Sequence, residues 1–185
     1  RQDAGAETIE LINLADTLGA SMERVRRRRQ NVEFDVQKVD WYLYGDDSAW
    51  ERALLNLCDN AAKWSPSGGT VTVRMSASDN LLTLDVADQG PGIPEADREL
   101  VFERFYRATE SRTMPGSGLG LAIVRQVVVK HGGTIEAREA PGGGALLHME
   151  LPGTPTSPEE SNLSDAATGQ AVQTDARTAP IKCGS

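Results

Sequence analysis

The sequence has few cysteines, no long hydrophobic run and no excess of positive charge. Its 2 cysteines, Cys58 and Cys183, lie far apart in 185 residues, which excludes a disulfide scaffold or a cysteine-rich zinc site. No stretch reaches the roughly 18 apolar residues that a membrane span needs, since even residues 119–129 are interrupted by Arg125 and Gln126. With 19 Lys+Arg against 27 Asp+Glu, the net charge of -8 argues against nucleic-acid binding.

The same absences indicate where the protein works. No secretory signal opens the chain, and it begins at Arg1 rather than Met, so we expect a piece of a longer protein. Two distant cysteines fit a reducing, cytoplasmic setting, and we expect no direct membrane contact by this piece.

Composition changes sharply near Pro152. Residues 154–185 contain no Phe, Trp or Tyr, and their only large aliphatic residues are Leu163, Val172 and Ile181. Such a segment buries too little apolar surface to offset an ordering entropy of roughly 1–2 kcal/mol per residue. We therefore predict one domain over residues 1–153 and a disordered tail over 154–185.

Hydrophobic periodicity divides the predicted domain into helices and strands. Helices are expected over residues 7–30, 46–64 and 119–131, and strands over 32–36, 41–44, 70–76, 81–87, 134–140 and 145–151. Hairpin turns are expected at Asp79-Asn80 and at Gly142–Gly144. The pattern predicts an α/β fold, a two-layer sandwich in which about three helices cover one face of one mixed sheet. The irregular region between Ala87 and Leu119 is too long for an ordinary loop, so we expect it to carry the chemistry.

The helix expected over residues 46–64 carries Asn56, Asn60 and Lys63 within one arc of roughly 60°. They border the face expected to pack into the core, which includes Trp50 and Leu54. Amide oxygens are acceptable Mg²⁺ ligands, and an ammonium group attracts phosphate. The pattern fits a magnesium–phosphate site; a merely solvated helix face is the alternative.

Two glycine-rich turns follow the expected strand and precede the last expected helix. Asp88-Gln89-Gly90-Pro91-Gly92 could hold an Asp acceptor against a ligand amino group, although Asp and Gly are also common in ordinary turns. The segment Gly116-Ser117-Gly118-Leu119-Gly120 leads into a helix, whose free N–H groups form an anion site.

Aromatic and basic residues lie between these two turns. Arg104, Arg107 and Arg112 could fold over a terminal phosphate or could be surface charge. Phe102 and Phe105 are expected to pin this loop to the core.

Taken in order, these segments resemble the ATP-binding catalytic domain of bacterial sensor histidine kinases, which has the Bergerat fold shared with gyrase-type ATPases. The resemblance covers residues 7–152, and it includes a long ATP lid before the last helix. Its four boxes match Asn56–Asn60, Asp88–Gly92, Phe102–Phe105 and Gly116–Gly120.

The resemblance implies that Asn60, helped by Asn56, holds Mg²⁺ and that Lys63 meets the phosphates of ATP. It further implies that Asp88 receives the adenine amino group and that Arg107 reaches the γ-phosphate, with Arg104 as a further candidate. The remaining implied contacts to the nucleotide are those of Trp64, Gly90, Gly92, Ile93, Gly116, Ser117, Gly118, Leu119 and Gly120.

The histidine that accepts phosphate in this family stands on a separate dimerisation domain. His131 ends an expected helix and His148 lies in an expected strand, so neither is in an acceptor-like setting. The implied partners are the dimerisation domain of the parent kinase and a response regulator. The parent kinase is expected to be a membrane-anchored sensor. A gyrase-type ATP-hydrolysing module is the alternative, but Asn56 stands where such enzymes carry a Glu base. A Ser kinase of the same fold is a further alternative.

Overall fold

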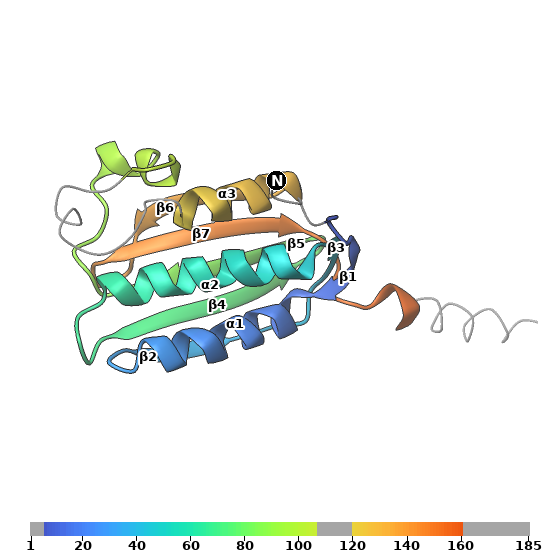
Figure 1. The fold of residues 1–185 in the computed structure, drawn as a ribbon, viewed down its shortest axis with the longest axis horizontal. Coiled ribbons are helices and arrows are strands. Elements are labelled where there is room, and N and C mark those ends of the chain that lie inside the picture. The colour runs from blue at the N-terminus through green and yellow to red at the C-terminus, as the bar shows by residue number, and fades with distance from the viewer. Residues whose placement is uncertain (1–5, 107–119, 161–185) are drawn as a thin grey trace, which may run out of the picture. The chain divides into compact units, whose positions relative to one another are not determined.

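A computed structural model describes residues 6–106 and 120–160 as a sheet with helices packed against one face (Figure 1). The predicted α/β two-layer sandwich is confirmed. The sandwich lies in the first of two units, Arg1–Pro155; Thr156–Ser185 is the second. The predicted lid residues 107–119 and tail residues 161–185 lie outside the described residues.

The main sheet has five strands in the order β2-β4-β5-β7-β6. Their bounds are Glu33–Gln37 for β2, Thr70–Ser78 for β4, Leu81–Ala87 for β5, Thr134–Glu139 for β6 and Ala145–Pro152 for β7. The β2–β4 pair is parallel and the other pairs are antiparallel, so the sheet is mixed, as predicted. Alternate side chains of β4 and β5 are buried under the helices, which explains the period-two pattern of these segments of the sequence.

The predicted turn at Asp79-Asn80 connects β4 and β5, and Asp79 adopts a positive φ of 50°. Asp tolerates this left-handed conformation better than most residues.

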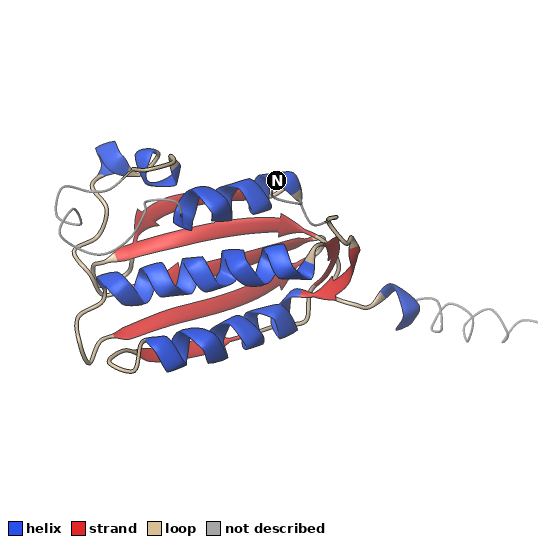
Figure 2. Cartoon of the chain, in the orientation of Figure 1, coloured by secondary structure: helices blue, strands red, loops and turns tan. Residues whose placement is uncertain are grey.

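Within residues 6–106 and 120–160, three helices form the second layer (Figure 2): α1 (Leu14–Arg28), α2 (Asp47–Trp64) and α3 (Gly120–Lys130). Helix α2 is central and packs against both α1 and α3. Its N-cap is Asp46, whose side chain accepts a hydrogen bond from the backbone of Ala49 at 3.2 Å. Trp50 and Leu54 are completely buried, so the predicted core face of this helix is confirmed.

The prediction of a helix over residues 7–30 is wrong for the N-terminal part of that range. Residues Glu10–Asn13 form strand β1, which pairs with β3 (Tyr42–Gly45) as a separate two-stranded antiparallel sheet. Helix α1 starts only after Asn13, whose side chain accepts hydrogen bonds from the backbone N–H of Ala15 and of Trp41, each at 3.2 Å. The spacing of Ile9 and Ile12 fits a helix, but pairing with a distant segment decides the local conformation.

In the described part of the region predicted to be irregular, residues 88–106, the chain forms two short 3₁₀ helices, η1 (Glu95–Asp97) and η2 (Leu100–Phe102). Phe102 is 4% exposed and anchors this region to the core, as predicted. The prediction for Phe105 is wrong, because its side chain is 72% exposed and its φ is positive, at 64°. None of the helices in the described part of the chain combines the length and the hydrophobicity that a membrane span requires.

Candidate functional site

The C-terminal half of α2 carries the predicted polar stripe. Asn56, Asn60 and Lys63 are half-buried, while their neighbours Leu57 and Ala61 are buried in the core. The three polar side chains therefore lie at the border between core and solvent, where amide oxygens and an ammonium group can reach a ligand. Among the described residues, no three or more His, Cys, Asp or Glu are grouped so that they could hold a metal ion.

Asp88 follows the last residue of β5 and is only 5% exposed. Its Oδ1 accepts two backbone hydrogen bonds, from Gly90 N at 2.9 Å and from Ala145 N at 3.0 Å. Burial raises the pKa of Asp88, and these two hydrogen bonds oppose the rise without cancelling it. Both bonds end on Oδ1, so the carboxyl group is held in one orientation and neither bond uses Oδ2.

The loop after Asp88 presses against the end of α2. A Cβ atom on Gly90 would lie 2.6 Å from the carbonyl oxygen of Trp64, so only glycine fits this approach. The Nζ atom of Lys63 lies 6.0 Å from the ring centroid of Trp64. Trp64 therefore lies close both to the loop after Asp88 and to Lys63, although Trp64 and Asp88 are 24 positions apart in the sequence.

The start of α3 approaches the same stripe from another side. A Cβ atom on Gly120 would lie 3.9 Å from the Cβ of Asn56. The first N–H groups of a helix have no partner within the helix and carry a partial positive charge. The polar stripe of α2 therefore lies between the Asp88 loop and a helix N-terminus, which is an arrangement suited to a polar base and its phosphates.

Of the other predicted site residues, the structure describes some and leaves the rest outside the described residues. Gly92 has a positive φ of 80°, and Ile93 is half-buried and packs against the core. Arg104 is exposed in the turn after η2. Arg107, Gly116, Ser117, Gly118 and Leu119 lie outside the described residues.

Three contributors to this site were missed by sequence reasoning. Ala145 supplies an N–H to Asp88, and Ser65 accepts a hydrogen bond at its Oγ from Gln89 N at 3.3 Å. Gln89 in turn accepts one at Oε1 from Thr70 N at 2.8 Å, which fixes the loop after Asp88. The glycine run before Ala145 indicated only a turn, because no local pattern shows which distant residue a turn contacts.

Both histidines are engaged by neighbouring groups. His131 follows α3, its Nδ1 lies 2.7 Å from the carbonyl oxygen of Val127, and its ring packs on Trp50. His148 is in β7, with Nδ1 2.5 Å from Oδ1 of Asp85.

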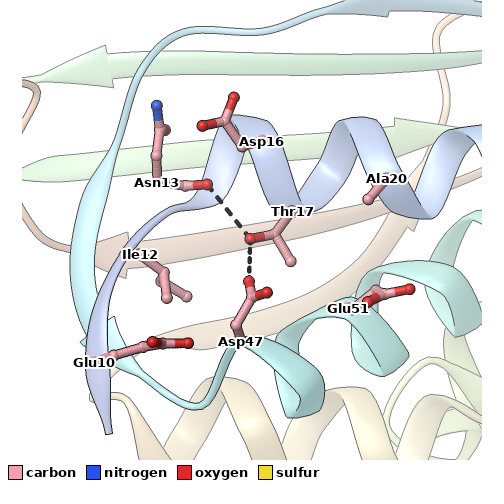
Figure 3. Close-up of a pocket in the computed structure, with 8 residues that line it drawn as sticks. All are labelled: Glu10, Ile12, Asn13, Asp16, Thr17, Ala20, Asp47 and Glu51. Atoms are coloured by element: carbon pink, nitrogen blue, oxygen red, sulfur yellow. Dashed lines mark hydrogen bonds between the residues drawn. The ribbon is translucent and has the colours of Figure 1, made fainter.

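A separate pocket of about 290 Å³ lies near the N-terminal ends of α1 and α2 (Figure 3). Four carboxylates line it, from Glu10, Asp16, Asp47 and Glu51, and Thr17 donates a hydrogen bond to Asp47 at 2.6 Å. Asp47 and Lys63 are 16 residues apart on one helix, which is about 24 Å. This pocket shares no residue with the predicted site, and its acidic lining would repel phosphate groups.

Comparison with known proteins identifies the architecture. A family model described as "Histidine kinase-, DNA gyrase B-, and HSP90-like ATPase" matches residues 45–155, more than half of the chain. The chain is 55% identical over 163 residues to a signal transduction histidine-protein kinase/phosphatase MprB of Mycobacterium sp. (strain KMS), covering 85% of this chain and 32% of the relative. The MprB of Mycobacterium leprae is 51% identical over 177 residues, covering 92% and 34%. The chain thus spans about a third of the length of these relatives.

Solved structures agree with the sequence comparison. A mycobacterial sensor histidine kinase MprB has 49% identity and a TM-score of 0.74, covering 80% of this chain and 100% of that one. The ATP-binding domain of PrrB from Mycobacterium tuberculosis has 28% identity and a TM-score of 0.64, covering 79% and 98%. The chain therefore belongs to the family of histidine kinase-, DNA gyrase B- and HSP90-like ATPases, as the ATPase domain of a sensor histidine kinase.

Proposed function

We propose that this domain binds ATP with Mg²⁺ and donates the γ-phosphoryl group to a histidine on the dimerisation domain of its parent kinase, for relay to a response regulator. The observation that carries the proposal is the buried carboxyl group of Asp88, held by two backbone N–H groups beside the polar stripe of α2. Support also comes from the full-length ShkA in complex with AMPPNP, an ATP analogue, which is 26% identical with a TM-score of 0.66 and covers 80% of this chain and 33% of that one.

Asp88 and its neighbours would bind the adenine base. Oδ1 already accepts two hydrogen bonds, so Oδ2 is the acceptor available to the adenine amino group. Gly90, Gly92 and Ile93 would shape the pocket around the base. Trp64, half-buried beside Gly90, would flank the nucleotide.

The polar stripe of α2 would meet the phosphates. The amide oxygens of Asn60 and Asn56 fit a hard cation that keeps several phosphate and water ligands, so they are our candidates for holding Mg²⁺. A bound Mg²⁺ would neutralise phosphate charge, and Lys63 adds a further positive charge. Arg107, with Arg104, would stabilise the γ-phosphate. The backbone amides of Gly116, Ser117, Gly118, Leu119 and Gly120 would cradle the phosphates.

The identity of residue 56 distinguishes phosphoryl transfer from hydrolysis of ATP. An amide cannot accept a proton from water at neutral pH, so Asn56 provides no general base for attack by water. The site therefore favours transfer to an acceptor brought by a partner. A Ser kinase of the same fold remains the second candidate, and the chemical stability of the product distinguishes the two.

We place the domain on the cytoplasmic side of a membrane-anchored parent.

The proposal is tested by calorimetric titration of ATP and Mg²⁺ into the parent chain and into Asp88→Asn. The Asn side chain keeps a carbonyl oxygen for both backbone donors but replaces Oδ2 with a donor. Leaving the adenine amino group unpaired costs about 1–3 kcal/mol, or roughly 5–150-fold in affinity.

Asp79→Asn is the matched control, because it changes the same functional group in a turn of the same sheet. It should bind as the parent does. Equal affinity of the parent and Asp88→Asn would rule out the adenine contact.

A further inference from the structure

The β6–β7 hairpin closes directly onto Asp88. Besides the bond from Ala145 N to Oδ1 at 3.0 Å, the backbone N–H of Asp88 donates to the carbonyl oxygen of Ala145 at 2.9 Å. The first residue of β7 therefore holds both the backbone and the side chain of Asp88. These contacts join residues 57 positions apart.

Three consecutive glycines form the turn, and only one of them faces Asp88. Gly142, Gly143 and Gly144 all have positive φ, at 85°, 97° and 93°. A Cβ atom on Gly144 would lie 2.1 Å from the carbonyl oxygen of Asp88 and 3.1 Å from its Oδ1. A Cβ atom on Gly142 or Gly143 would have nothing within 4 Å. A side chain would thus strain the backbone to a comparable degree at all three positions. It would collide with Asp88 only at Gly144.

We propose that Gly144 is a positioning residue of the nucleotide site, because its missing side chain lets the hairpin approach Asp88 closely enough to orient the carboxyl group. The inference rests on the proposed function of Asp88 and extends it to a turn outside the four nucleotide-binding segments. Gly144 acts through Asp88: a side chain here pushes the turn away and lengthens the Ala145 N–H to Oδ1 hydrogen bond. Of the two donors to Oδ1 in the described residues, the carboxyl group then keeps Gly90 N.

The first test needs no nucleotide. The Asp88 carboxyl group is titrated by carbon NMR in the parent, Gly144→Ala, Gly142→Ala and Gly143→Ala. Since the Ala145 N–H lowers the pKa of Asp88, weakening that bond should move the titration midpoint upward in Gly144→Ala. The two control variants should titrate as the parent does. An unchanged midpoint in folded Gly144→Ala, or an equal rise in Gly143→Ala, overturns the proposal.

The second test measures binding of ATP and of purine riboside triphosphate, which lacks the adenine amino group. Gly144→Ala should lose affinity for ATP, at most by the roughly 5–150-fold expected for complete loss of the adenine contact, and stay within about 2-fold for the other nucleotide, because only ATP uses the oriented acceptor. Equal losses for both nucleotides contradict a role through Asp88.

If the parent binds both nucleotides equally, the adenine contact of the proposed function is refuted, while the NMR result still decides whether Gly144 fixes Asp88. Should Gly144→Ala fail to fold, Ala145→Pro removes the same N–H, and proline is tolerated at the first residue of a strand. This variant should give the same upward midpoint and the same selective loss of ATP; a parent-like result overturns the proposal.

Discussion

The environment of Asp88 favours ligand binding at the expense of the stability of the fold. Burial makes the charged form costly, and backbone donors at Oδ1 offset only part of this cost, so its pKa is raised above the ordinary value of 3.8. In the described residues both hydrogen bonds end on Oδ1, so a ligand donor that reaches Oδ2 would stabilise this buried acceptor further. Perturbed carboxyl groups of this kind are common at functional sites.

The raised pKa of Asp88 predicts that Asp88→Asn stabilises the protein at neutral pH. The folded chain holds the Asp88 proton more tightly than the unfolded chain does, so stability falls as pH rises from about 3.8 toward the raised value. The neutral amide removes this dependence. We expect thermal unfolding at pH 7 to move upward by about 2–4 °C for each kcal/mol recovered, and the gain to vanish near pH 3. A lower midpoint for Asp88→Asn at pH 7 would contradict the argument.

Asn60 provides a prediction about the metal. Asn60→Ala should remove most of the difference between nucleotide affinities measured with Mg²⁺ and with excess chelator. Alanine is the better helix former by up to about 0.7 kcal/mol, so the substitution should not weaken α2 itself. The control is Arg52→Ala, an exposed position of the same helix. If Asn60→Ala keeps the parental response to Mg²⁺, Asn60 is not a ligand.

At the scale of elements, Asn13 decides where α1 begins. Its Oδ1 accepts hydrogen bonds from Ala15 N at the helix start and from Trp41 N, and its Nδ2 donates to Asp40 at 2.9 Å. One side chain thus caps the helix and connects it to the segment before β3. The N-cap residue of α2, Asp46, accepts a hydrogen bond from the backbone N–H of Ala49 in the same helix.

This difference predicts unequal costs for two cap removals. Asp46→Ala should lower the free energy of unfolding by about 1 kcal/mol, the usual value for a lost N-cap. Asn13→Ala should cost about 2–4 kcal/mol, because it also leaves Trp41 N without its acceptor. Urea unfolding of both variants measures the difference. Equal costs would show that the contact with Trp41 N contributes nothing.

At the scale of the whole molecule, the domain carries the groups that we propose bind ATP, while both histidines in its sequence are engaged in the fold. His131 lies against Trp50, and His148 pairs with Asp85 in the sheet. Transfer of phosphate requires a nucleophile aligned with the γ-phosphate. We therefore expect the acceptor to come from another domain.

The corresponding prediction concerns transfer between separate proteins. Incubation of this chain with ATP labelled at the γ-phosphate should leave the chain unlabelled. Adding the separate histidine-bearing dimerisation domain should label that domain with an acid-labile phosphate, and Asp88→Asn should reduce the rate roughly 5–150-fold below saturation. Acid-stable label on the partner would indicate a Ser kinase, and label on His131 of this chain alone would refute the mechanism.

Tertiary structure alone decided several features of the fold and the site. Residues Glu10–Asn13 carry a pattern compatible with a helix and become a strand only because β3, about 30 residues later, pairs with them. Phe105 has the residue type of a core anchor but is exposed. The approach of Gly144 and Ala145 to Asp88 joins segments 57 residues apart, which no local periodicity records.

The sequence by itself determined the elements whose side chains repeat with a clear period. The buried face of α2, the β4–β5 hairpin and the placement of Asn56, Asn60 and Lys63 on one stripe follow from 3.6-residue and two-residue spacing. The order of the four motifs likewise indicated the family. Spacing along one element predicts which side chains share a face, whereas contacts between elements depend on how the whole chain packs. The geometry around Asp88 belongs to the second kind, because its donors come from a loop and a hairpin that only folding brings together.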